Sequence, residues 1–354
     1  MTKSIQQHEL FMKRCLELAN SGLGHVAPNP MVGAIVIHND KVIGEGYHIK
    51  YGQAHAEVNA IQAVKDPMML VKSTLYVNLE PCTHVGKTPP CSDLIISKGI
   101  RKVVIGMTDP NPVVGGKGVE KLRKKGVEVI TNILTKECRE LNRRFITFYE
   151  KQRPYIILKW AQTNDKYIDL DRKQGEPVGI NWISNPLSRT IVHRWRSEEQ
   201  AIMVGTNTVM IDNPQLNVRH WNGNSPIRVV LDRSLRISSS SNIFDYSSPS
   251  LIFNEKKNEK VGNNEFIQID FGSGMFNQLF HELFSRQIQS IIVEGGKKLL
   301  ESLIEQNIWD EARVLIGDKN FGKGYAAPVI PLRAETVINI LNDKLLYYRN
   351  HSII

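Results

Sequence analysis

The chain has 354 residues, of which 41% are hydrophobic and 23% are charged, a balance typical of soluble globular proteins. This length predicts two domains, because single hydrophobic cores stop growing beyond roughly 250–300 residues. No apolar run approaches the roughly 18 residues that span a bilayer, and the start of the chain shows no signal-peptide pattern. We therefore expect a cytoplasmic protein that does not bind membranes.

The formal charge of +9 comes from 45 Lys and Arg residues against 36 Asp and Glu residues. Such a surplus suits nucleic acid and small phosphorylated substrates equally, so charge alone selects no function. Four cysteines in a chain of this length argue against a disulfide framework. Cys15 and Cys138 stand in helical patterns and are interpreted as buried small hydrophobic residues, which leaves Cys82 and Cys91 for another role.

Helical and strand patterns alternate over the first 150 residues, which predicts a three-layer α/β domain with a mixed sheet. Helices are expected at 7–21, 55–64, 92–98, 118–125 and 135–150. Strands are expected at 31–37, 73–79, 102–107 and 127–130, with a further short strand that ends at Gly46.

A domain boundary is expected near residue 150, because Pro154 disfavours helix in the residue before it. Residues 151–354 then repeat the alternation, which predicts a second α/β domain. Strands are expected at 154–160, 201–205, 227–232, 250–253 and 290–293. Helices are expected near 186–199, 276–287 and 297–306, and loops at 234–250 and 256–264.

Three features that suit a metal lie within forty residues of the first domain: His55-Ala56-Glu57, Pro81-Cys82 and Cys91. One imidazole and two thiolates leave the fourth position of tetrahedral zinc for a water molecule. Zinc lowers the pKa of this water from ~16 toward ~7, and the Glu57 carboxylate could move its proton to a leaving nitrogen. H-x-E followed by Pro-Cys and a second Cys is typical of zinc nucleobase deaminases, which usually carry C-x-x-C.

The spacing also constrains where such a site lies. Residues i and i+2 point apart in mid-helix, so His55 and Glu57 must stand at the start of a helix. Cys91 opens the next helix, where the backbone dipole favours thiolate over thiol. The alternative is a structural zinc site with His84 as a fourth ligand, although structural sites usually have closer cysteine pairs.

Five stretches of the first domain resemble the bifunctional riboflavin-biosynthesis deaminase–reductase family: 28–33, 44–48, 55–57, 81–91 and 109–112. The resemblance extends over essentially the whole chain. It implies an N-terminal domain like cytidine deaminase (1–150) and a C-terminal domain like dihydrofolate reductase (151–354). It also implies zinc and NADPH as cofactors.

The family implies hydrolytic removal of the 2-amino group of 2,5-diamino-6-ribosylamino-4(3H)-pyrimidinone 5′-phosphate. NADPH then reduces the ribosyl group to ribityl by hydride transfer to C1′ of the opened imine, with no enzyme nucleophile. We expect a small phosphorylated pyrimidine as the substrate, no nucleic acid, and a homo-oligomer.

In the deaminase domain the resemblance places zinc ligands at His55, Cys82 and Cys91 and the proton shuttle at Glu57. It places pyrimidine and phosphate contacts at Asn29, His48, His84 and Lys87. Without the family pattern, Asn29 would be interpreted as a turn residue between prolines and Lys87 as an exposed loop charge.

The second domain carries weaker signals by itself. No G-x-G-x-x-G follows a strand, so the Rossmann fingerprint is absent. Glu294-Gly295-Gly296 lies between a buried strand and a helix, where it could bind phosphate or form a tight connection. Trp182 alone would be a core residue, and Arg196 and Arg219 alone would form surface ion pairs.

The resemblance assigns these residues to two groups. Cofactor contacts are implied at Ala161, Trp182, Thr208, Asp212, Gly295 and Gly296. Substrate contacts are implied at Arg196, Leu216, Arg219 and Glu294. Two departures affect this domain: residues 163–167 lack the glycine that the family commonly has there, and Ile180 replaces a frequent serine. Ile180 is therefore left out of the predicted site.

Two other functions compete with this hypothesis. The first is a zinc deaminase that acts on RNA or on a free nucleobase or nucleoside. RNA would suit the basic charge, but an RNA deaminase would not need the pattern between Trp182 and Arg219. A non-catalytic zinc-stabilised binding module would keep its function when Glu57 is replaced by Gln.

Overall fold

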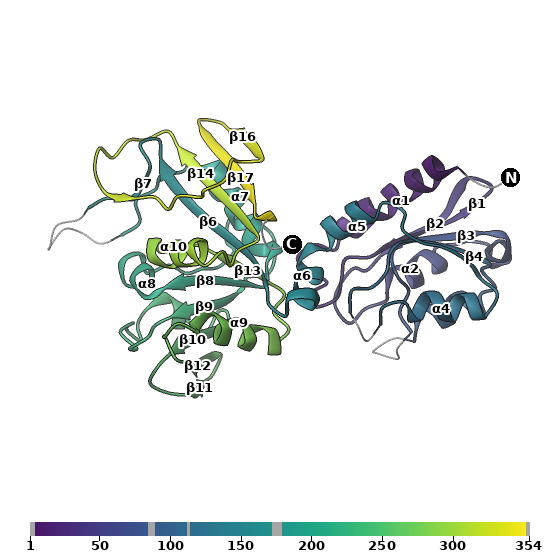
Figure 1. Cartoon of the computed structure of the whole chain (residues 1–354), viewed down its shortest axis with the longest axis horizontal. Helices are drawn as coiled ribbons and strands as arrows, with labels where there is room; N and C mark the ends of the chain where they lie inside the picture. The colour runs from purple at the N-terminus through teal and green to yellow at the C-terminus, as the bar shows by residue number, and fades with distance from the viewer. Residues whose placement is uncertain (1–3, 84–88, 112–113, 172–178, 352–354) are drawn as a thin grey trace. The chain divides into compact units, whose positions relative to one another are not determined.

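The computed structural model describes residues 4–83, 89–111, 114–171 and 179–351 (Figure 1). The chain divides into two compact units, Met1–Gln152 and Arg153–Ile354, each with its own sheet. No helix in the described ranges is both long enough and apolar enough to cross a bilayer.

The first unit is built on a five-stranded mixed sheet with the order β2-β1-β3-β4-β5. Its strands are β1 (Gly33–His38), β2 (Lys41–Tyr47), β3 (Thr74–Leu79), β4 (Lys102–Met107) and β5 (Glu128–Ile130). β1 pairs antiparallel with β2 and with β3, whereas β3, β4 and β5 are parallel. The carboxyl ends of β3 and β4 therefore meet at one edge, where the chain leaves the sheet for the next helices.

Helices cover both faces of this sheet, as the sequence predicts for a three-layer domain (Figure 1). One face packs against α1 (Ile5–Asn20), α5 (Thr135–Leu141) and α6 (Arg143–Lys151). The other packs against α2 (Ala56–Gln62), α3 (Cys91–Ser97) and α4 (Lys117–Lys124), and a 3-10 helix, η1, spans Pro67–Lys72. Cys15 and Cys138 are fully buried among apolar side chains, as expected.

The single helix expected over 135–150 is wrong, because α5 and α6 are separated at Asn142. The buried Asn142 side chain accepts the main-chain N–H of Met31 at 2.8 Å and donates to the Met31 carbonyl oxygen at 2.9 Å. The amide thus fixes the segment that leads into β1 from the point where the two helices meet. Periodicity cannot reveal such a partner, which lies 111 residues away in the chain.

The second unit is built on a ten-stranded sheet with the order β11-β12-β10-β9-β8-β13-β6-β14-β17-β16. Seven neighbouring strands, from β12 to β14 in this order, are parallel. They are β6 (Tyr155–Thr163), β8 (Ala201–Gly205), β9 (Ile227–Leu231), β10 (Ser250–Asn254), β12 (Asn264–Gln268), β13 (Ser290–Val293) and β14 (Glu311–Gly317). Antiparallel strands close both edges: β11 (Glu259–Val261), β17 (Asp343–Arg349) and β16 (Thr336–Ile340).

Helices again cover both faces of the sheet. One face packs against α7 (Pro186–Glu198) and α8 (Thr206–Asp212), and the other against α9 (Met275–Ser285) and α10 (Lys297–Glu305). Two short strands, β7 (Tyr167–Asp169) and β15 (Tyr325–Ala326), form a separate ribbon, and a 3-10 helix, η2, spans Asn242–Phe244.

The loop expected at 256–264 is wrong in part, because it contains β11 and the first residue of β12. A two-residue turn at Gly262-Asn263 joins these strands, and Gly262 has a φ of +58°. Glycine followed by asparagine is typical of tight hairpin turns, so this hairpin could be predicted from the turn residues.

Candidate functional site

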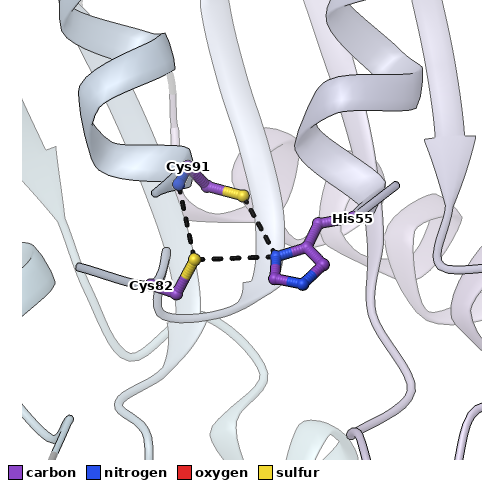
Figure 2. Close-up of side chains that lie close together, drawn as sticks. All are labelled: His55, Cys82 and Cys91. Carbon is purple, nitrogen blue, oxygen red and sulfur yellow. Dashed lines mark hydrogen bonds between the residues drawn. The ribbon is translucent and has the colours of Figure 1, made fainter. Parts of the chain in front are cut away.

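Three side chains meet where strands of the first unit give way to helices (Figure 2). His55 is the residue before α2, Cys91 is the first residue of α3, and Cys82 follows β3 after Glu80 and Pro81. His55 Nδ1 lies 3.6 Å from Cys82 Sγ and 3.3 Å from Cys91 Sγ. The main-chain N–H of Cys91 also donates to Cys82 Sγ at 3.4 Å.

The donor set of these residues suits a zinc ion. The imidazole nitrogen and the two sulfur atoms all lie within 4.8 Å of one another, which allows one ion to contact all three. Nitrogen and thiolate sulfur are the ligands that zinc prefers, and three protein ligands leave a fourth position for water. Hydrogen bonds, first from Cys91 and then from His55, lower the pKa of the Cys82 thiol against the opposing effect of burial. Hydrogen bonding thus favours a thiolate at Cys82, whereas the hydrogen bond with Cys82 and then burial raise the pKa of the Cys91 thiol.

Glu57 lies in the first turn of α2 with its side chain buried. Burial, followed by the nearby charge of Cys82, raises the pKa of its carboxyl to about 7. A carboxyl with a pKa in this range can both accept and donate a proton at neutral pH.

Asn29 and His48 form a polar pair beside the three potential ligands. Asn29 Nδ2 donates to His48 Nε2 at 3.1 Å, and His48 Nδ1 donates to the Ala54 carbonyl oxygen at 3.0 Å. The rings of His48 and His55 lie edge to face with centroids 5.4 Å apart. The structure thus brings two predicted substrate contacts to the cluster, whereas His84 and Lys87 lie outside the described residues.

Glu80 supports this site but was not identified from the sequence. It directly follows β3, and its buried carboxylate accepts hydrogen bonds of 2.8–3.1 Å from four main-chain N–H groups, those of Asp109, Gly116, Gly118 and Val119. These bonds attach the chain just before Cys82 to the segment that leads into α4. The signal in the sequence is an acidic residue at the end of an apolar strand.

The second unit contains a cavity of 1020 Å³ at the carboxyl ends of its parallel strands. Ligands in open α/β sheets commonly bind at this edge. All ten residues predicted for this domain line the cavity: Ala161, Trp182, Arg196, Thr208, Asp212, Leu216, Arg219, Glu294, Gly295 and Gly296. Ile180, which the prediction left out, lines it as well.

A buried group of charges forms part of the cavity wall. Arg196 Nε and Nη2 donate to the two carboxylate oxygens of Glu294, both at 2.7 Å, and Lys159 Nζ donates to Glu294 Oε2 at 3.4 Å. Burial alone would raise the pKa of Glu294, but the charges of Arg196 and Lys159 lower it to about 2. Glu294 therefore stays ionised at neutral pH and fixes both cations at the cavity.

Lys159 was not identified from the sequence. Val293 of β13 pairs with Leu158 of β6, so the residues that follow these two, Glu294 and Lys159, come together. This contact depends on the register of two strands that are far apart in the chain. A single lysine between apolar strand residues carries no comparable local signal.

The glycine turn after β13 passes close to α8. The main-chain N–H of Gly205 donates to the Gly295 carbonyl oxygen at 3.1 Å. Gly295 has a φ of +137°, and a Cβ at Gly296 would lie 3.1 Å from Thr208 Oγ1. Glycine thus lets the main chain approach Thr208 at the cavity wall.

Trp182 is not a core residue, because 45% of its surface is exposed. Its ring lies under the Arg189 guanidinium, 4.5 Å from the ring centroid, at the cavity wall. Arg196 does not form a surface ion pair either, since its side chain is only 12% exposed.

Residues 163–167, where the family commonly has a glycine and this chain has none, form a tight turn at the end of β6. Lys166 has a φ of +67°, a conformation that favours glycine. Asp165 accepts hydrogen bonds from Thr163 Oγ1 and from the main-chain N–H groups of Phe321 and Gly322. These bonds maintain the turn although a lysine occupies the left-handed position.

Two protein-family models match the chain, one in each of the two units. Residues 5–107 match the cytidine and deoxycytidylate deaminase zinc-binding region, and residues 154–342 match the RibD C-terminal domain. The chain is therefore an enzyme with a zinc-binding deaminase domain and a reductase domain that uses NADPH.

Full-length relatives define the family further. The chain is 37% identical to the riboflavin biosynthesis protein RibD of Aquifex aeolicus, over 96% of this chain and 98% of the relative. It is 32% identical to RibD of Escherichia coli, over 89% of each chain. The chain belongs to the RibD family of riboflavin biosynthesis proteins.

Solved structures show the same architecture. A diaminohydroxyphosphoribosylaminopyrimidine deaminase/5-amino-6-(5-phosphoribosylamino)uracil reductase from Thermotoga maritima superposes with a TM-score of 0.87 at 38% identity. The match covers 98% of this chain and 99% of that one. Acinetobacter baumannii RibD gives a TM-score of 0.86 at 29% identity, over 97% and 99%. These matches confirm the predicted fold class, a cytidine-deaminase-like domain followed by a dihydrofolate-reductase-like domain.

The cysteine cluster predicts how zinc content responds to substitution. Replacing Cys82 or Cys91 with Ser should reduce bound zinc from about one ion per chain to a small fraction, because a hydroxyl is a poor zinc ligand. Elemental analysis of dialysed protein measures this. Cys15→Ala, at a cysteine away from the cluster, should keep its zinc, and full zinc content in both serine variants would contradict the assignment.

The turn at residues 163–167 predicts a gain in stability. Lys166→Gly should raise the free energy of unfolding by about 0.5–1 kcal/mol, because glycine adopts the left-handed conformation without a steric cost. Urea denaturation followed by circular dichroism measures the change. Lys166→Ala keeps the strained conformation and should give no gain, so equal stabilisation by both variants would exclude this cause.

Proposed function

We propose that this enzyme catalyses two consecutive steps of riboflavin synthesis. The first replaces the 2-amino group of 2,5-diamino-6-ribosylamino-4(3H)-pyrimidinone 5′-phosphate with oxygen and releases ammonia. The second uses NADPH to reduce the ribosyl group of the product to ribityl. The observation that carries the proposal is that one chain contains both sites. The first unit holds the cluster of His55, Cys82 and Cys91 with Glu57 beside it, and the RibD-type second domain holds a basic cavity.

In the deaminase site, His55, Cys82 and Cys91 would hold zinc, which when bound supplies a water molecule of lowered pKa. Glu57 accepts a proton from the attacking oxygen and donates it to the leaving nitrogen. Its burial supports this role, because a raised carboxyl pKa makes both transfers accessible near neutral pH.

Asn29 and His48 would orient the pyrimidine. The Asn29 amide offers a donor and an acceptor to the edge of the ring. His48 donates from Nδ1 to a main-chain carbonyl, so its Nε2 is an acceptor that fixes the Asn29 amide group. On the strength of the family resemblance, His84 and Lys87 remain proposed substrate contacts, with Lys87 toward the phosphate.

In the reductase cavity, the nicotinamide would deliver hydride to C1′ of the opened ribose imine. Arg196 and Arg219 would bind the 5′-phosphate, and Leu216 and Glu294 would contact the rest of the substrate. The proposed cofactor contacts are Ala161, Trp182, Thr208, Asp212, Gly295 and Gly296. One cavity of 1020 Å³ is lined by the residues of both proposed groups, which supports a site where cofactor and substrate meet.

The proposal includes a small phosphorylated pyrimidine as the substrate, a cytoplasmic location and a homo-oligomeric state. RNA as the substrate is not favoured, because the family match over residues 154–342 and the full-length relatives account for the second domain. The same relatives argue against a non-catalytic zinc module.

A coupled assay with Glu57→Gln tests the function. The wild-type enzyme, given zinc, NADPH and the diaminopyrimidinone substrate, should release ammonia and then consume an equal amount of NADPH. Glu57→Gln should slow ammonia release by roughly 10²–10⁴-fold because the proton shuttle is lost. It should keep its zinc and still reduce the deaminated intermediate.

The control is Glu45→Gln, which removes an exposed carboxylate of the same unit that pairs with Arg14. This variant should keep both activities. The proposal fails if wild-type enzyme releases no ammonia, and the role of Glu57 fails if the glutamine variant deaminates at the normal rate.

A further inference from the structure

One face of α7 carries three polar side chains into the reductase cavity. Arg189, His193 and Arg196 are four and three residues apart, so they lie on the same side of the helix and all line the cavity. Arg196 belongs to the charged group around Glu294, and Arg189 covers Trp182. His193 lies between them, is only 4% exposed, and has no role in the function proposed above.

His193 and Arg196 both form hydrogen bonds with the loop at residues 217–219. The main-chain N–H of Arg219 donates to His193 Nδ1 at 3.2 Å, and Arg196 Nη1 donates to the Asn217 carbonyl oxygen at 3.1 Å. Within that loop, Arg219 Nη1 donates to Asn217 Oδ1 at 3.0 Å. The position of the Arg219 guanidinium relative to Arg196 thus depends on two hydrogen bonds to neighbouring turns of α7.

The hydrogen bond from Arg219 determines the protonation state of the His193 ring. A ring nitrogen that accepts a hydrogen bond carries no proton, so the ring is neutral and its single proton is on Nε2. Burial, and after it the charges of Arg196 and Arg219, lowers the pKa of His193 to about 4. The other titratable groups that face the ring are His220, 4.7 Å away between centroids, and Glu294.

Nε2–H is the remaining donor of this ring. Within the described part of the chain it has no hydrogen-bond acceptor, and the ring lines the cavity. Lys159, Arg196 and Arg219 lie around the single carboxylate of Glu294, and this excess of positive charge suits a phosphate monoester. A neutral donor at this place adds a hydrogen bond to phosphate without a further buried charge.

We propose that His193 is a positioning residue for the substrate phosphate. Its Nδ1 holds the loop that carries Arg219, and its Nε2–H donates to a phosphate oxygen. This inference rests on the proposed reductase function and on the phosphate contacts of Arg196 and Arg219.

Two variants separate the two functions of the ring. His193→Phe keeps the ring volume and removes both hydrogen bonds. His193→Asn places an amide oxygen near the position of Nδ1, so it keeps the acceptor for the loop and loses the donor to phosphate. Steady-state kinetics with the deaminated 5′-phosphate substrate and NADPH measures KM and kcat for both.

His193→Phe should raise the KM for the phosphorylated substrate by roughly 10- to 100-fold, the effect of losing hydrogen bonds to a charged group and its loop. His193→Asn should recover part of this loss. Both variants should keep kcat within about threefold, and the KM for NADPH should not change, because the proposal assigns the ring to the phosphate and to the loop of Arg219.

The decisive comparison uses the same substrate without its phosphate. Wild type and His193→Phe should then have KM values that agree within about threefold. Arg194→Gln is the matched control on α7, since Arg194 pairs with Glu198 and does not line the cavity, and it should behave like wild type.

An unchanged KM in His193→Phe, or an equal rise with and without the phosphate, would overturn the inference. ¹⁵N NMR of labelled histidine gives a second readout, and a proton on Nδ1 rather than Nε2 would also overturn it. If the wild-type enzyme does not reduce the phosphorylated substrate at all, the proposed function fails instead.

Discussion

Both active regions depend on one constraint: parallel strands end at the same edge of a sheet, so residues at or beside their carboxyl ends come together. In the first unit, Cys82 follows β3 and Cys91 opens the next helix. In the second, Glu294 follows β13 and lies next to Lys159 of β6. Helices cover both faces of these sheets, so chemistry concentrates where a strand ends; Lys159, within the longer β6, lies beside the end of β13. The sheets thereby bring together residues that are distant in the chain.

Each region holds a buried carboxyl group, and burial disfavours its ionised form. The two regions offset this desolvation cost in different ways. Glu294 remains ionised because two cations accompany it, and removing one partner of such a group commonly costs several kcal/mol. For Glu57, burial and then the charge of Cys82 raise the pKa of the carboxyl to about 7. One carboxyl is thus a fixed charge that orients neighbours, whereas the other can exchange a proton. The same residue type has two uses because the surroundings differ.

The sequence predicts local patterns well and distant contacts poorly. His55, Glu57, Cys82 and Cys91 could be proposed from spacing, because each stands at the start of a helix or the end of a strand. Glu294, Gly295 and Gly296 form a local turn that left two interpretations open, whereas the other seven reductase residues were accessible only through family resemblance. The contact of Lys159 with Glu294 depends on the register between β6 and β13, and Asn142 holds Met31, which lies 111 residues away in the chain. Neither leaves a periodic signal near the residue itself.

The central claim is that one chain contains two chemically independent sites, of which only the first needs zinc. Selective removal of zinc tests it most directly, with each half-reaction assayed separately before and after treatment with a chelator. The account predicts that ammonia release stops and returns on addition of zinc, while NADPH-dependent reduction of the deaminated intermediate continues at its original rate. Loss of both activities in a chain that remains folded, or retention of deamination by the zinc-free enzyme, would contradict it.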